Sequence, residues 1–288
     1  METTELLKRV RRIEIKTRGL TQQIFAGEYH SAFKGKGMTF SEVREYQYGD
    51  DIRNIDWNVT ARFNHPFIKT YEEERELTVM LLIDVSGSRD FASNMRLKRD
   101  LITEISAVLA FSAISNNDKI GAILFSDQVE KFIPPKKGIQ HILRIIRELI
   151  YFEPQNRGTH ISGALEYLIN AIKKRSTAFI ISDFMDEGFE DALKIGSRKH
   201  DIIALRVYDQ RETELPDVGM ISMKDAETGK QVWVDSSIRN GREHYSHYWK
   251  ERTSRIHEIL KKSGIDYTDI ATHEDYVKPL MQLFKKRA

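Results

Sequence analysis

The sequence predicts an α/β protein with a doubly wound, mostly parallel sheet, a small N-terminal β-rich elaboration and an inserted β-hairpin. The run LTVMLLID (77–84) is apolar without alternation, as in a central parallel strand that is covered on both faces. From residue 77 onward, strand patterns and helix patterns alternate along the chain. Right-handed crossovers between parallel strands then make the doubly wound topology nearly obligatory.

Each element after residue 77 follows from its hydrophobic pattern. The helix expected at 97–114 carries a stripe formed by Leu97, Leu101, Ile105 and Val108. The segment GMISMKD, the turn AETGK and the segment QVWVDS together predict the inserted hairpin. The other expected strands are 119–126, a short antiparallel edge strand at 129–133, 177–184, 201–209 and 266–272, and the other expected helices are 138–150, 160–174, 189–199, 242–263 and 275–286.

Residues 1–76 are expected to form a separate N-terminal part, and residues 77–288 the main domain. The first residues predict an amphipathic helix, because Leu6, Leu7, Val10 and Ile13 recur at helical spacing. In 16–76, glycines, aromatic residues and charges mix without a helical period, which favours short strands and turns.

Composition excludes several classes of function. The chain has 288 residues, 40% of them hydrophobic and 31% charged, with a net charge of +2, so nothing draws it strongly to nucleic acid. It has no cysteine, which excludes disulfides and fits a reducing cytoplasm. No apolar run approaches the roughly 18–20 residues of a membrane span, and the N-terminus lacks the apolar core of a signal peptide. We therefore expect a cytoplasmic protein that does not bind nucleic acid.

Polar residues follow the predicted strands where a ligand site is expected. Asp84, Ser86 and Ser88 come after the first strand, and Asp183 ends the strand TAFIISD. Thr159 precedes a helix, in a loop that returns to the same edge of the sheet. Ligands of open parallel sheets bind in the crevice beyond the carboxyl ends of the strands. These five residues therefore form a candidate site, although Asp and Ser are also common in turns and helix caps.

The donors of this candidate site are two carboxylates and three hydroxyls. Such oxygen ligands suit Mg²⁺, or Mn²⁺ or another divalent cation, and Mg²⁺ usually keeps several waters. Gly87 allows the backbone to turn closely enough for Ser86 and Ser88 to face one point. A cation with few charged ligands would accept another carboxylate from a partner protein.

The motif DVSGS, the pair GT at 158–159 and the strand-terminal Asp183 resemble the metal-ion-dependent adhesion site of von Willebrand factor A-like domains, which have a Rossmann-type fold. The resemblance implies that Asp84, Ser86, Ser88, Thr159 and Asp183 are the metal ligands. The family commonly has methionine after the second serine, where this chain has Arg89 followed by Asp90.

The segments GDDIRNIDWNVTARF and PFIKTYEEERE resemble the signature of the bacterial domain-of-unknown-function-58 family, in which this stretch leads into the A-like domain. The resemblance covers roughly residues 25–270. It implies an adaptor or cochaperone that accompanies a MoxR-type AAA+ ATPase.

Other chemistry fits the sequence less well. A haloacid-dehalogenase-type site needs a second aspartate where Ser86 stands, and the Gly-x-Ser-x-Gly and P-loop patterns are absent. His244 and His247 could ligate a metal, but a place beside a Tyr245–Trp249 packing stripe is favoured. Asp50, Asp51 and Asp56 could hold a second cation, but ion pairing with Arg53 and Arg62 and packing with Trp57 are favoured.

Two hypotheses remain for the candidate site. The first is a metal-ion-dependent protein-binding module that is not an enzyme and that binds an acidic residue of a MoxR-type ATPase or its client. The second is a metal-dependent hydrolase with His160 as general base, since His160 adjoins Thr159. The first is favoured because no other histidine or lysine lies within the predicted site loops.

Overall fold

The computed structural model describes residues 38–73, 77–90, 97–224 and 230–287. Two compact units divide the chain, one of residues 34–77 and the other of residues 1–33 with 78–288. The predicted helix near Leu6 and the last three residues of the EEERE segment, 74–76, lie outside the described residues. The predicted boundary between residues 76 and 77 stays a prediction.

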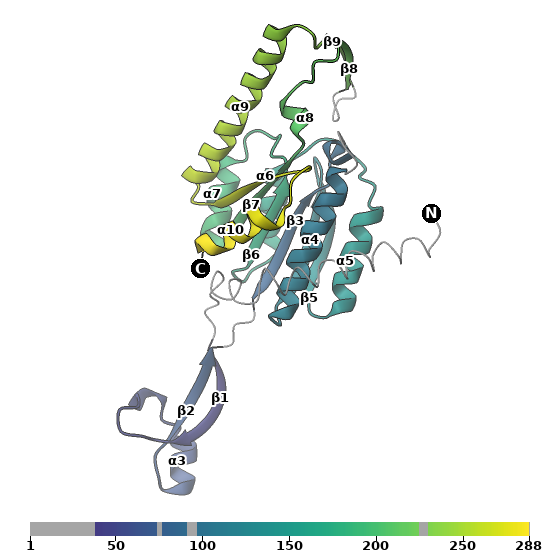
Figure 1. Ribbon diagram of the computed structural model, residues 1–288. Coiled ribbons are helices and arrows are strands. Elements are labelled where there is room, and N and C mark those ends of the chain that lie inside the picture. The colour runs from purple at the N-terminus through teal and green to yellow at the C-terminus, as the bar shows by residue number, and fades with distance from the viewer. Residues whose placement is uncertain (1–37, 74–76, 91–96, 225–229, 288) are drawn as a thin grey trace. The chain divides into compact units, whose positions relative to one another are not determined.

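The larger unit contains the predicted sheet (Figure 1). In its described part, six strands lie in the order β10-β7-β6-β3-β4-β5, all parallel except β5, which is antiparallel to β4. The strands are β3 (Thr78–Asp84), β4 (Lys119–Phe125), β5 (Val129–Lys136), β6 (Thr177–Ser182), β7 (Asp201–Tyr208) and β10 (Asp266–Ala271). The doubly wound, mostly parallel α/β fold is confirmed.

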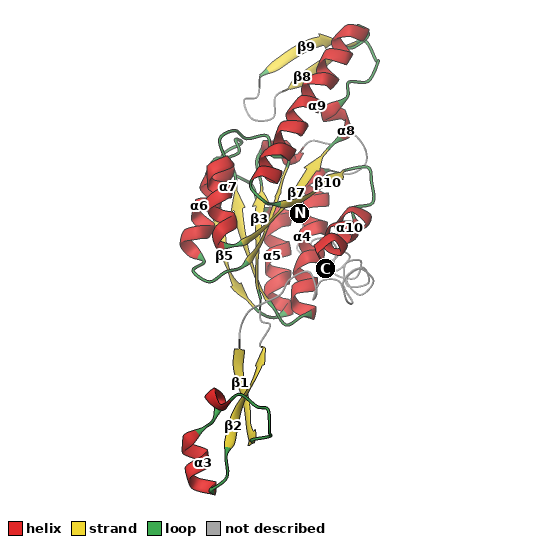
Figure 2. Ribbon diagram, turned by 90° about the vertical axis from the view of Figure 1, so that its left-hand side faces the viewer, coloured by secondary structure: helices red, strands yellow, loops and turns green. Residues whose placement is uncertain are grey.

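Helices cover both faces of this sheet, as the two views show (Figures 1 and 2). α4, α5 and α10 lie on one face, and α6, α7 and α9 lie on the other. The helices are α4 (Lys98–Ser115), α5 (Ile139–Tyr151), α6 (Ile161–Ala171), α7 (Glu190–Lys199), α8 (Gln210–Thr213), α9 (Arg239–Lys262) and α10 (Val277–Arg287). This double cover explains why β3 is apolar at successive positions rather than alternating.

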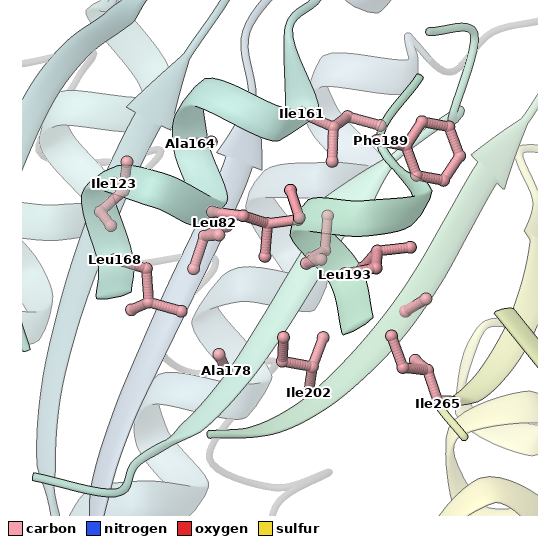
Figure 3. Packing of buried hydrophobic residues seen from close by; sticks show 14 of the residues in the cluster. Leu82, Ile123, Ile161, Ala164, Leu168, Ala178, Phe189, Leu193, Ile202 and Ile265 are labelled. Atoms are coloured by element: carbon pink, nitrogen blue, oxygen red, sulfur yellow. The ribbon is translucent and has the colours of Figure 1, made fainter. Parts of the chain in front are cut away.

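The core on the α6 side joins the sheet to three helices (Figure 3). Leu82 and Ile123 of the sheet pack with Leu168 of α6 and Leu193 of α7 in one buried cluster. Leu260 brings α9 into the same cluster. Burying one such side chain contributes about 1.5–3 kcal/mol, so this layer fixes the positions of the loops at the strand ends.

The edge strand β5 is longer than expected, because it continues through Pro134 and Pro135. The register with β4 shifts between Ile120 and Ala122, opposite these prolines. Proline has no N–H and is confined to edge strands and bulges. A Cβ on Gly121 would lie 2.9 Å from the Ile133 carbonyl oxygen and 2.9 Å from the Pro135 nitrogen, so this close approach requires glycine.

The inserted hairpin is confirmed as β8 (Met220–Lys224) and β9 (Gln231–Asp235), which pair antiparallel. It follows the short helix α8 and precedes α9, a helix of 24 residues. The sequence placed the start of α9 at residue 242, whereas the helix begins at Arg239.

The smaller unit contains a hairpin of β1 (Met38–Glu45) and β2 (Phe67–Glu73), with a 3₁₀ turn at Ile52–Asn54 and the helix α3 (Trp57–Phe63) between them. The helix corrects the expectation of strands and turns alone. Its signals are caps rather than periodicity. The Asp56 carboxylate accepts hydrogen bonds from the N–H groups of Asn58 and Val59, and Asn64 ends the helix with φ of 60°.

Candidate functional site

The candidate site lies at the switch point of the sheet. β3 lies between β6 and β4 in the strand order, so the chain leaves β3 in one direction and later returns on its other side. In open α/β sheets, this reversal opens a crevice beyond the carboxyl ends of the strands, where ligands bind. Asp84 is the last residue of β3, and Asp183 follows the last residue of β6. Both carboxylates are therefore at this edge, and both are buried.

The loop after β3 folds back on the Asp84 carboxylate. The Ser86 N–H donates to Asp84 Oδ1 at 2.9 Å. A 3₁₀ turn begins at Gly87, and it brings the hydroxyl oxygens of Ser86 and Ser88 to 3.2 Å from each other. The predicted convergence of the two serines is therefore present.

Hydrogen bonds connect the ends of β3 and β6. The Ser182 hydroxyl donates to Asp84 Oδ2 at 2.6 Å, and the Ser88 hydroxyl is hydrogen-bonded to the Asp183 carboxylate. Asp183 Oδ1 also accepts from the Met185 N–H at 3.1 Å. Phe184, between Asp183 and Met185, has a φ of 59°. This conformation is rare for a bulky residue and costs on the order of 1 kcal/mol or more of conformational free energy. These hydrogen bonds hold the backbone of residues 182–185 and fix the orientation of the Asp183 carboxylate.

The loop that carries Thr159 reaches the same edge. The Gly87 N–H donates to the Arg157 carbonyl at 3.0 Å, which ties this loop to the turn after β3. The His160 N–H donates to the Ser126 carbonyl at 2.8 Å, beyond the end of β4. Thr159 is partly buried between these two anchors.

Two carboxylates that the sequence analysis did not single out position the Thr159 loop. Glu130 Oε1 accepts from the N–H groups of Gln155 and Asn156 at 3.1 and 3.3 Å. Asp186 Oδ2 accepts from the Ile161 N–H at 2.8 Å and so caps α6 from the loop after β6. Such contacts join residues distant in sequence, so spacing alone gave no signal for them.

A buried lysine is the largest addition to the predicted site. The Lys98 ammonium at the start of α4 lies 3.0 Å from Asp183 Oδ2 and 2.8 Å from Glu212 Oε1. Its side chain is only 2% exposed. The sequence did hold a signal, because Lys98 precedes Leu101, Ile102 and Ile105 on the apolar stripe of the helix.

The two aspartates have opposite electrostatic environments. Burial and the neighbouring charge of Asp183 raise the pKa of Asp84 to about 6. Burial also acts to raise the pKa of Asp183, but the Lys98 ammonium and hydrogen bonds from Ser88 and Met185 outweigh it, and the pKa is lowered. Negative charge at Asp84 is thus incompletely compensated by the described residues.

The donor chemistry fits a hard cation. No group of three or more His, Cys, Asp or Glu side chains that could hold a metal occurs among the described residues. A cation here would depend on the hydroxyls and on water as well as on Asp84 and Asp183, a set of oxygen ligands that suits Mg²⁺.

Three other expectations can be compared with the structure. His160 is exposed, and its ring lies over Gly163, where a Cβ would be 2.8 Å from Nδ1. His247 lies 3.3 Å from Glu251, and Tyr245 contacts Trp249 edge to face.

The three aspartates of the smaller unit pair with cations. Asp50 pairs with Arg44, Asp51 with Arg53 and Asp56 with Lys69, which agrees with the favoured ion pairing while changing two partners. Trp57 is 70% exposed, so its expected packing role is not seen.

Comparison with known proteins places the fold and the family. An uncharacterized protein of Mycobacterium bovis is 26% identical over 294 residues, covering 100% of this chain and 91% of its own. The solved structure of BatB from Bacteroides thetaiotaomicron covers 73% of this chain and 98% of its own, with 16% identity and a TM-score of 0.50. An aerotolerance-related membrane protein from Bacteroides fragilis covers the same shares, with 17% identity and a TM-score of 0.51.

These structural likenesses concern the fold alone. Within the described part of this chain, no helix combines the length and apolar character that a membrane span requires. A family model described as "Protein of unknown function DUF58" matches residues 42–255, which is most of the chain. The chain therefore belongs to the DUF58 family.

Proposed function

We propose that this protein is a metal-ion-dependent protein-binding module, with Asp84, Ser86, Ser88, Thr159 and Asp183 as the metal ligands. The observation that carries the proposal is the convergence of Asp84, Ser86, Ser88 and Asp183 at the switch point of the sheet. Mg²⁺ or another divalent cation bound there would offer its remaining coordination position to a carboxylate of a partner protein.

The proposed partner is a cytoplasmic MoxR-type AAA+ ATPase or a client of that ATPase. Support for this partner comes from the family resemblance, and support for a protein ligand comes from the chemistry of the site. An acidic side chain is the simplest group that a protein can bring to a hard cation.

Binding is favoured over hydrolysis because neither His160 nor Lys98 is placed to act as a general base. Hydrolysis would need a group within hydrogen-bond reach of the attacking water. His160 is exposed and its ring lies over Gly163 of α6. Lys98 is held by Asp183 and Glu212, so it has no neutral nitrogen to act as a base.

The test is a pull-down of a MoxR-type ATPase from the same genome with the full-length chain as bait. Capture is expected with Mg²⁺ and not with excess chelator, and Asp84→Asn should abolish it. Asp269→Asn is the matched control, because Asp269 is a partly buried carboxylate on the edge strand β10, outside the site, and this variant should preserve capture. Equal capture with Mg²⁺ and with chelator would contradict metal dependence. Metal-dependent turnover of a phosphoester that disappears in His160→Ala would favour the hydrolase instead.

A further inference from the structure

The Lys98 ammonium contacts one of the proposed metal ligands directly. It donates to Asp183 Oδ2 at 3.0 Å and to both carboxylate oxygens of Glu212 at 2.8 and 3.1 Å. A single ammonium is thus shared between one predicted metal ligand, Asp183, and one carboxylate that is not a predicted ligand, Glu212. An ammonium is a compact, strongly hydrated point charge, and it competes with a metal ion for the same carboxylate oxygen.

Glu212 is held firmly in this arrangement. It lies on α8, where its carboxylate accepts from the Asp209 N–H at 3.0 Å to complete a capping box. Its carbonyl accepts from the Tyr245 hydroxyl at 2.8 Å, which ties α8 to α9. The Glu212 side chain is only 16% exposed. Glu212 therefore shares the Lys98 ammonium with Asp183 from a fixed position.

The charges at this edge do not balance. Asp84, Asp183 and Glu212 are three carboxylates, and Lys98 is the cation that contacts two of them. When these four side chains are ionised, their summed charge is negative, and a divalent cation would neutralise it.

We propose that Lys98 is a built-in counter-ion that sets the divalent-cation affinity of this site, and that Glu212 tunes it by sharing the ammonium with Asp183. The proposal rests on the proposed metal site. Lys98 lowers the affinity of the site for the metal ion, because it holds Asp183 Oδ2 and adds a positive charge. Glu212 opposes both effects. Lys98 also keeps Glu212 paired, so that Glu212 does not become an additional metal ligand.

The test is isothermal titration calorimetry of Mg²⁺ and Mn²⁺ into the chelator-treated full-length protein. Glu212→Gln is isosteric and removes the charge that shares Lys98, so the dissociation constant should rise on the order of tenfold. Lys98→Met removes the competing charge and exposes Glu212, so affinity should increase on the order of tenfold or more. The double variant Lys98→Met/Glu212→Gln restores the charge excess of the wild type, and its affinity should lie within about threefold of wild type.

Arg206→Met is the matched control, because it removes a buried cation that pairs with Asp269 outside the site. Its affinity for Mg²⁺ and Mn²⁺ should be unchanged. Far-UV circular dichroism establishes that each variant is folded. If Lys98→Met does not fold, the result for Glu212→Gln decides alone, because this change keeps the size of the side chain and one of its two acceptor oxygens.

The outcomes separate this proposal from the proposed function. If the wild type binds the cations and Glu212→Gln and Lys98→Met bind them equally well, Lys98 has no such role and the metal site stands. If only Lys98→Met binds, Lys98 controls the site and the wild type uses its ammonium in place of a metal, which overturns metal-dependent binding. Binding by no variant overturns both.

Discussion

Two groups of buried charges in the same sheet are arranged in opposite ways. At the carboxyl edge, one cation, Lys98, contacts two carboxylates, Asp183 and Glu212. On β7, β10 and α9, one carboxylate, Asp269, contacts two cationic or potentially cationic side chains. Arg206 Nε lies 2.8 Å and His257 Nε2 lies 3.0 Å from its oxygens.

Aromatic side chains also contact both cationic partners of Asp269 in the second cluster. The Arg206 guanidinium lies 4.5 Å from the centre of the Tyr208 ring, and His257 stacks on Tyr267 at 4.6 Å. Hydrogen bonds and charges from His257 and Arg206 outweigh burial and lower the pKa of Asp269 to about 2. This cluster has enough positive charge without any ligand, whereas the carboxyl edge has an excess of negative charge. The difference supports a structural role for the Asp269 cluster and the proposed ligand-binding role for the carboxyl edge.

The largest expected difference between the clusters is in the free energy of unfolding when Lys98 or Arg206 is replaced by methionine. Without divalent metal, Lys98→Met should lower the free energy of unfolding by about 3–5 kcal/mol, because it leaves two buried carboxylates unpaired. Arg206→Met should cost less, about 1–2 kcal/mol, because Asp269 is 29% exposed and keeps His257. Urea denaturation monitored by circular dichroism measures both values. A larger cost for Arg206→Met would reverse the assigned roles of the clusters.

The next effect concerns added metal. At a Mg²⁺ concentration of 100 times the dissociation constant, the free energy of unfolding of the wild type should rise by about 2.7 kcal/mol, since the cation binds the native state. Asp84→Asn should lose this gain, because it removes a carboxylate ligand. Asp269→Asn should keep it. Thermal denaturation with Mg²⁺ and with chelator provides the measurement, and equal gains in Asp84→Asn and the wild type would remove Asp84 from the site.

The smallest effect is the dependence on acid at Asp269. Its pKa is about 2 in the folded protein and near 3.8 in the unfolded chain, so the unfolded state binds more protons in this range. The stability that it contributes, about 2 kcal/mol, is present above about pH 4 and is lost as the pH falls toward 2. The difference in unfolding free energy between wild type and Asp269→Asn should therefore shrink over this window. A difference that stays constant from pH 5 to pH 2 would contradict the assigned pairing.

Much of the fold followed from the sequence because the buried strands are unambiguous. β3 and β6 are buried runs that each lead to an aspartate, and α5 carries a clear apolar stripe. The helix α3 was missed because it is short and is specified by the caps at Asp56 and Asn64 rather than by burial. Pattern reasoning depends on a buried face, and α3 contains no buried residue.

The candidate site was only partly predictable. Asp84, Ser86 and Ser88 are close in sequence, so their convergence follows from one turn. Lys98 and Glu212 reach the site through contacts that are distant in sequence. Lys98 is 85 positions from Asp183, and Glu212 is 114 positions from Lys98. Such pairing is decided by how α4 and α8 pack on the sheet, and no local pattern encodes it.

The two prolines in β5 have a consequence for assembly. An edge strand normally presents a row of N–H and carbonyl groups that another chain can extend, which is a route to aggregation. Pro134 and Pro135 carry no N–H, and the register shift beside them interrupts the regular spacing of the remaining groups. A strand from a second molecule would therefore lack donors over this stretch. The protein is protected along this edge against uncontrolled sheet extension between copies.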